Sequence, residues 1–175
     1  MNSQPQSAQQ KADVMAEALA QPGAQDLLAT ARLARLAYNG LDGLPRVIPI
    51  GFHWNGGQIV VCGAPISPKV RAMAARPQVA LTIDTDGETG PRSLLLRGTA
   101  ATDIVDGVPG EHIAASTKGL DGEQASQVEA GMRAMYRQMA RTVITPQWAR
   151  YYDFAAGRMP GFLQELAAGA SGSAQ

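Results

Sequence analysis

With 175 residues, the chain is long enough for one domain whose buried core needs no disulfide or structural metal. Its 15 basic and 15 acidic residues cancel, which argues against a nucleic-acid or membrane-surface binder, because such proteins depend on a basic excess. A single cysteine excludes an internal disulfide, and with only two histidines no metal site is expected.

The two ends of the chain differ in composition from its middle. Residues 1–10 and 167–175 are rich in small and polar residues, so we expect disordered tails around a single domain of residues 11–166. The N-terminus lacks the basic and apolar segments of a signal peptide, and no apolar run approaches the ~18 residues of a membrane helix. The sequence therefore predicts a soluble, cytoplasmic protein.

The first half of the domain changes from helical to strand patterns. Apolar residues with helical spacing come first and end at Pro22-Gly23, and apolar runs separated by turn sequences such as Asn55-Gly56-Gly57 follow. Pro49 cannot donate to a strand ladder, so its part of the sheet should lie at an edge. The predicted elements are helices at residues 11–20 and 24–28 and strands at residues 31–38, 46–54 and 58–63.

The second half begins with a helix for which Ser67 is the natural N-cap and Pro68 the first residue. Gly98 interrupts a long strand and should mark a bulge, which a closing barrel needs. The pattern predicts a mainly β, α+β fold, with an antiparallel meander forming a small closed or split barrel. The predicted elements are a helix at 67–76, strands at 79–84 and 93–104, helices at 110–116 and 122–140 within a helical insert of about residues 109–140, strands at 141–144 and 147–154, and a short segment at 160–166.

The cluster Ser67, Lys69 and Arg71 is the strongest candidate site. Unpaired N–H groups and the dipole of a helix start favour an anion, to which these side chains add a hydroxyl, a point charge and a bidentate fork. A phosphate site and a capped surface helix with solvated cations fit this spacing equally well. Arg46 would reach the same phosphate if its strand passes the helix start, and is otherwise an exposed turn arginine.

Three further features have both a functional and a plain structural interpretation. A flat heteroaromatic ring could stack on the apolar segment 47–50, which could equally be a core strand. His53 is a candidate proton donor or an inert residue at a strand end. Trp148, Arg150 and Tyr151 could anchor a subunit interface or form the core and rim of one barrel.

Residues 27–104 resemble the pyridoxamine 5′-phosphate oxidase-like family of flavin-binding split barrels. The resemblance rests on three segments, LPRVIPIGFHWNGG at residues 44–57, SPKVR at 67–71 and RPQVALTID at 76–84. It implies a homodimer with two cofactor sites at the subunit interface, each closed by the other subunit. The cofactor-binding residues expected from the resemblance and the cluster are Arg46, Val47, Ile48, Pro49, Ile50, Ser67, Lys69, Val70 and Arg71, with Trp148 and Arg150 on the closing strand.

The resemblance also implies the cofactor and the activity. The expected cofactor is FMN, with an 8-hydroxy-5-deazaflavin coenzyme as the alternative, since both carry a phosphate and a similar tricyclic ring. The expected activity is an oxidoreductase that moves a hydride between this ring and a small organic substrate. A non-catalytic flavin- or haem-binding carrier or sensor of the same fold is the alternative, with His53 or His112 as candidate haem ligands.

Overall fold

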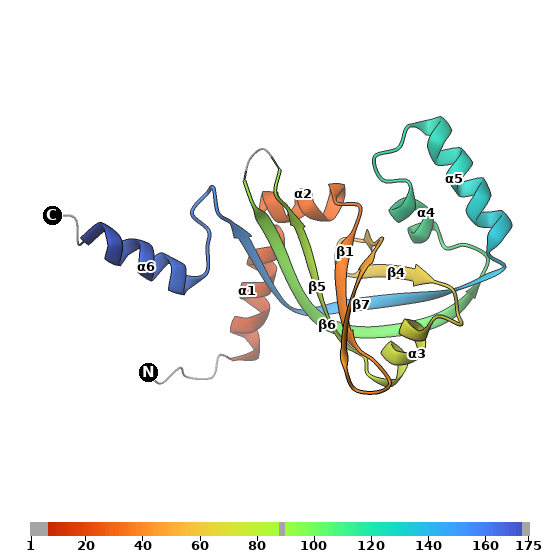
Figure 1. Cartoon of the computed structure of the whole chain (residues 1–175), viewed down its shortest axis with the longest axis horizontal. Helices are drawn as coiled ribbons and strands as arrows, with labels where there is room; N and C mark the ends of the chain where they lie inside the picture. Colours follow the sequence, from red (N-terminus) through yellow and green to blue (C-terminus); the bar gives the residue numbers. More distant parts are fainter. Residues whose placement is uncertain (1–6, 88–89, 173–175) are drawn as a thin grey trace.

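The computed structural model describes residues 7–87 and 90–172 (Figure 1). Within them, no helix combines the length and the apolar character that crossing a bilayer requires. The helices are α1 (Ala8–Ala20), α2 (Pro22–Thr30), α3 (Pro68–Ala75), α4 (Gly110–Ser116), α5 (Gly122–Met135) and α6 (Gly161–Gly172). The strands are β1 (Ala34–Asn39), β2 (Pro45–Ile50), β3 (His53–Trp54), β4 (Ile59–Gly63), β5 (Gln78–Thr85), β6 (Arg92–Asp106) and β7 (Gln138–Asp153).

The strands form one seven-stranded antiparallel sheet in the order β2-β1-β5-β6-β7-β4-β3. The two edge strands, β2 and β3, are consecutive in the chain, and only Gly51 and Phe52 separate them. Because so short a connection spans at most ~11 Å, the sheet has to curl until its two edges approach each other. The long strands β6 and β7 curve through the whole body (Figure 1). The predicted α+β class and antiparallel sheet are confirmed.

Alternate strand residues point into the curled sheet and form the main core. In β1, Ala34, Leu36 and Tyr38 are buried, whereas the residues between them are exposed or half-buried. Phe52, in the bend between the two edges, is completely buried. The two N-terminal helices complete this core with Ala18, Ala24, Leu27 and Leu28.

A second, smaller cluster lies on the outer face of the sheet, under α4 and α5. Val60 and Cys62 of β4 and Met139 of β7 are buried there together with Val108. The partly buried residues that pack on this cluster are Ile113, Met132, Tyr136 and Val143. The predicted helical insert therefore has a defined place, because it covers the outer face at one end of the sheet (Figure 1).

Two predicted strand boundaries are wrong. The single strand predicted at residues 46–54 is divided at Gly51 and Phe52, where the chain passes from one sheet edge to the other. The two strands predicted at 141–144 and 147–154 are one continuous strand, because the bulge opposite Gly98 lets β7 continue past Pro146. The predicted bulge at Gly98 and the edge position of Pro49 are both confirmed.

The helix boundaries also differ from the sequence pattern. We expected a helix to continue to residue 140, but α5 ends at Met135 and β7 begins at Gln138. The backbone from Gln138 pairs with β6, and Met139 is completely buried in the outer cluster under α4 and α5. Residues 8–10 and 167–172, which we expected in disordered tails, are helical. A capping box between Ser7 and Gln10 explains the early start of α1. The remaining tail residues, 1–6 and 173–175, lie outside the described part of the chain.

Candidate functional site

The start of α3 follows closely on the end of β4. Pro68 occupies the first helical position and Ser67 has the extended backbone of an N-cap residue, as the sequence predicts. The Ser67 side chain makes no capping hydrogen bond, so its hydroxyl remains available to a ligand. The N–H of Val70 donates to the Ser67 carbonyl at 3.0 Å and closes the first turn. Because the Val70 side chain is buried, it anchors the helix to the body.

Two cations stand in the first turn of α3. Within the described part of the chain, neither Lys69 nor Arg71 has an ion-pair partner. A Cβ at Gly63 would lie 3.2 Å from Nζ of Lys69, so this glycine leaves the space in which the ammonium group lies against the end of β4. A helix start with an available hydroxyl and two unpaired cations is suited to a phosphate group.

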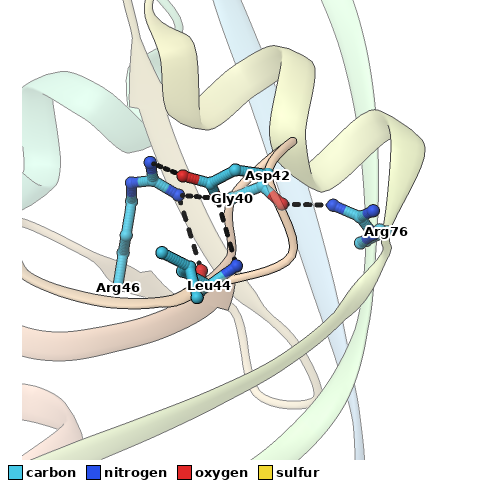
Figure 2. A network of polar contacts seen from close by, with 5 residues as sticks. All are labelled: Gly40, Asp42, Leu44, Arg46 and Arg76. Carbon is cyan, nitrogen blue, oxygen red and sulfur yellow. Dashed lines mark hydrogen bonds and ion pairs between the residues drawn. The ribbon is translucent and has the colours of Figure 1, made fainter.

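Arg46, the second residue of β2, is held by the turn that precedes this strand (Figure 2). Its two terminal nitrogens donate to the two carboxylate oxygens of Asp42, each at 2.9 Å. The same carboxylate accepts the Leu44 N–H at 3.1 Å, and Arg76 donates to the Gly40 carbonyl in the same turn. The hydrogen bond from Arg46 lowers the pKa of Asp42 to about 2, so this pair stays charged at neutral pH.

The same turn and α3 border one cavity. Its volume is about 290 Å³, and it is lined by Tyr38, Gly40, Leu41, Asp42, Arg46, Pro68 and Ala72. The start of β2 therefore passes the start of α3, which is the condition under which we expected Arg46 to reach the phosphate. Because Asp42 already binds the guanidinium group, Arg46 would have to exchange this carboxylate for a phosphate.

The side chains of β2 do not form one continuous surface. Ile48 and Ile50 oppose Leu36 and Ala34 of β1 and point into the core, where Ile50 is buried. Val47 and Pro49 point to the outer face and are exposed. Any group that stacks on this strand can therefore use the side chains of only one face, together with the backbone of an edge strand.

Trp148 lies far from Val47 within one chain. The strand register places both at the ends of a single row on the outer face, running Val47, Ala37, Ala80, Arg97 and Trp148 across five strands. Four spacings of ~4.8 Å between neighbouring strands separate them by roughly 19 Å along the sheet. Within one chain, Trp148 and β2 are therefore too far apart to contact the same flat ring.

Arg97 is a residue of this outer face that the sequence analysis missed. Its guanidinium carbon lies 4.0 Å from the centre of the Trp148 ring, and that of Arg150 lies 5.2 Å from it. Both cations therefore lie within cation–π distance of the indole on the outer face. Arg97 precedes Gly98, which the sequence marked as the place of the bulge, but only the register with β7 shows that Arg97 lies opposite Trp148.

The architecture defines a class of protein, a curled antiparallel sheet with helices at its ends and, beside an edge strand, a helix start that carries two unpaired cations. Residues 22–144 match the pyridoxamine 5′-phosphate oxidase family, and the chain belongs to this family. No curated protein is significantly similar to the chain.

Several solved structures share the fold. A conserved hypothetical protein from Mycobacterium tuberculosis is 20% identical, with a TM-score of 0.58 over 77% of this chain and 85% of that one. An F420 reductase is 24% identical, with a TM-score of 0.52 over 71% of this chain and 94% of its own. A haem storage protein from Vibrio cholerae is 16% identical, with a TM-score of 0.53 over 74% and 92% of the two chains. These similarities establish a split-barrel fold.

Proposed function

We propose that this protein is a flavin- or deazaflavin-dependent oxidoreductase that binds FMN, or a deazaflavin coenzyme, through the start of α3. The observation that carries this proposal is the set of unpaired groups there, the Ser67 hydroxyl and the Lys69 and Arg71 cations. Membership of the pyridoxamine 5′-phosphate oxidase family supports it.

The residues present fit such a cofactor. Ser67, Lys69 and Arg71 would hold its phosphate, and Arg46 would join them after leaving Asp42. The outward face of β2, with Val47 and Pro49, would lie against the ring system, since these apolar side chains are exposed. Ile48 and Ile50 support the strand from the core and are not proposed to contact the ring through their side chains.

The bound cofactor would supply the hydride chemistry, while the protein binds and orients it. The contribution of this chain is then mostly electrostatic, because the positive helix start neutralises the phosphate and the edge strand fixes the position of the ring. This division explains why the residues at α3 and β2 include no pair arranged for general acid–base catalysis.

The outer face supports the proposal that two chains form a homodimer. This face carries exposed apolar side chains, such as Val47, which is 64% exposed. It also carries Trp148, on whose ring the Arg97 guanidinium group lies. Because one chain holds β2 and Trp148 apart, a second copy packed on this face would supply Trp148 and Arg150 to the cofactor bound by the first. Light scattering tests this directly: Val47→Glu should give a monomer, whereas the matched variant Val128→Glu, on exposed α5, should leave the dimer intact.

The cofactor proposal is tested by binding of FMN and riboflavin to the wild type and to Lys69→Ala. Loss of one charge-assisted phosphate contact, worth about 1.5–3 kcal/mol, should weaken FMN binding by roughly 10- to 150-fold. Riboflavin lacks the phosphate, so its affinity should not change. An unchanged FMN affinity would refute the phosphate site at α3.

The absorption spectrum separates the enzyme from a carrier of the same fold. Flavin or deazaflavin that binds and then accepts or returns a hydride with a small organic substrate supports the oxidoreductase. A Soret band on adding haem, lost in His53→Ala or His112→Ala, would instead support haem binding. Binding of neither cofactor by the wild type would refute the cofactor-dependent function.

A further inference from the structure

A second cavity lies between α4, the beginning of β1 and the bend that joins β2 to β3. Its volume is about 440 Å³, which is within the range of small-molecule sites. The residues that line it are Arg32, Leu33, Ile50, Gly51, Cys62, His112, Ala115 and Ser116. It is separate from the cavity beside Arg46, with which it shares no lining residue.

The polar side chains of this cavity are hydrogen-bond donors. Arg32, His112 and Ser116 line it, and their side chains have no hydrogen-bond or ion-pair partner within the described part of the chain. No carboxylate is among the lining residues. Burial lowers the pKa of His112, so its imidazole is neutral at pH 7 and has one N–H to donate. The cavity therefore offers the positive charge of Arg32 and the neutral donors of His112 and Ser116, and it contains no carboxylate that would repel an anion, so it is suited to bind an anionic group.

The rest of the lining is apolar. Leu33 and Ala115 present hydrocarbon surface, Ile50 borders the cavity at the end of β2, and Gly51 leaves its side open. A Cβ at Gly51 would meet only ordinary contacts, with the Ala115 Cβ and the Arg32 carbonyl both 3.9 Å away. A ligand that fits must therefore combine a compact apolar body with one anionic end.

The helical wall of the cavity is fixed at both ends. Before His112, Glu111 accepts two hydrogen bonds from Arg141 of β7, at 3.0 Å and 2.6 Å. After Ser116, the Lys118 ammonium group donates to the carbonyls at the end of α2, at 3.2 Å and 3.1 Å. These contacts hold α4 in place, so the donors of its face are already positioned before a ligand arrives.

The cavity also adjoins the elements assigned to the cofactor. Ile50 ends the edge strand proposed to support the ring, and Cys62 immediately precedes Gly63, over which the Lys69 ammonium group lies. A molecule in this cavity would thus lie beside the end of β2, where a substrate has to contact the ring system of the proposed cofactor. This assignment of the substrate position rests on the proposed function.

We propose that this cavity binds the substrate and selects a small organic acid, whose carboxylate is recognised by Arg32, His112 and Ser116. The body of the acid packs against Leu33 and Ala115, beside the end of β2 at Ile50. Arg32 and His112 are then specificity-determining residues, and the reaction occurs at the end of the molecule that faces Gly51.

The test uses the full chain without flavin and two probes of equal shape, benzoate and neutral benzamide. Backbone amide shifts in NMR spectra locate each probe and give its affinity. Benzoate should shift the amides of Gly51, Cys62 and Ser116 and bind at least tenfold more tightly than benzamide. Arg32→Gln and His112→Gln should each remove most of this preference for the anion. The control Arg137→Gln changes another exposed arginine that lines none of these cavities and should bind benzoate like the wild type.

The outcomes separate this proposal from the cofactor assignment. Benzoate shifts that lie elsewhere, no binding up to the solubility limit, or equal affinity of the wild type and Arg32→Gln would overturn the acid site. Because Arg32 is exposed, its variant should fold even if His112→Gln does not. Failure of FMN to bind while benzoate still binds at Gly51 and Ser116 would refute the cofactor and leave the acid site standing. Perturbation of the flavin absorption by benzoate in the FMN-loaded protein would support both together.

Discussion

Replacing Lys118 by methionine tests whether one half-buried cation holds α4 to the barrel. The ammonium group donates to the carbonyls of Leu28 and Ala31 at the end of α2. It also lies 3.8 Å from the centre of the Phe52 ring, which is completely buried in the bend between the sheet edges. One side chain therefore joins α4, α2 and the β2–β3 bend.

The size of the effect can be worked out from these contacts. Hydrogen bonds to a charged group contribute about 1.5–3 kcal/mol each, and Lys118 makes two of them. Burial lowers the pKa of Lys118, which means that desolvation of the ammonium group offsets part of this gain. Methionine can still pack on Phe52 but leaves both carbonyls without their donor. We expect the free energy of unfolding to fall by about 2–3 kcal/mol.

The assay is urea unfolding at a fixed protein concentration, together with the melting temperature. For a chain of this size, the expected loss corresponds to a fall in Tm of about 4–12 °C. Lys11→Met is the matched control, because Lys11 is exposed on α1 and should leave stability unchanged to within about 0.5 kcal/mol. If Lys118→Met is as stable as this control, Lys118 does not fix α4, and the wall of the cavity is not held in place before a ligand binds.

Three further predictions concern single positions. A Cβ at Gly98 would lie 2.3 Å from a backbone carbonyl oxygen, so Gly98→Ala should lower the free energy of unfolding by about 1–3 kcal/mol. The control Gly131→Ala places its Cβ in open space on α5 and should raise the free energy of unfolding by about 0.5–1 kcal/mol. Burial raises the pKa of Cys62 to about 11, so its alkylation by iodoacetamide should be slow at pH 8 and accelerate steadily toward pH 11; fast reaction at pH 8 would contradict this. The hydrogen bond from Arg141 lowers the pKa of Glu111 below its usual value, so the pair stabilises the fold above the unfolded value of about 4.3 and loses this effect as the pH falls through the folded pKa. The stability difference between wild type and Glu111→Gln, measured by urea unfolding, should therefore shrink below about pH 4, and a constant difference would contradict the assignment.

Local sequence signals predicted the structure correctly where it depends on residues that are adjacent in the sequence. Ser67 and Pro68 define the start of α3, because an N-cap and a first-turn proline act within one turn of helix. Asn55 and Gly56 similarly define the hairpin between β3 and β4, since Gly56 adopts the positive φ that this turn requires. The same local reasoning identified Gly98 as a bulge.

Local signals failed where strand pairing or burial competes with them. The helical spacing of apolar residues continues past Met135, but the backbone there pairs with β6 and becomes strand. Pro146 would end an isolated strand, yet β7 continues because the bulge opposite Gly98 accommodates it. The sequence predicted Arg46 near a phosphate only on the condition that its strand passes the start of α3, and it did not predict the ion pair with Asp42, because that pair depends on the path of the turn.

The α+β class, most of the elements and the position of Ser67, Lys69 and Arg71 at one helix start follow from the sequence, because they depend on periodicity, caps and turns that act over a few residues. The folded arrangement was needed to show that Val47 and Trp148 share the outer face yet lie far apart, and that Arg32 and His112 line one cavity. These positions depend on the register of the curled sheet and on the contacts that hold its helices. Register and helix contacts are set by pairing and packing between residues far apart in the sequence, which no local pattern predicts.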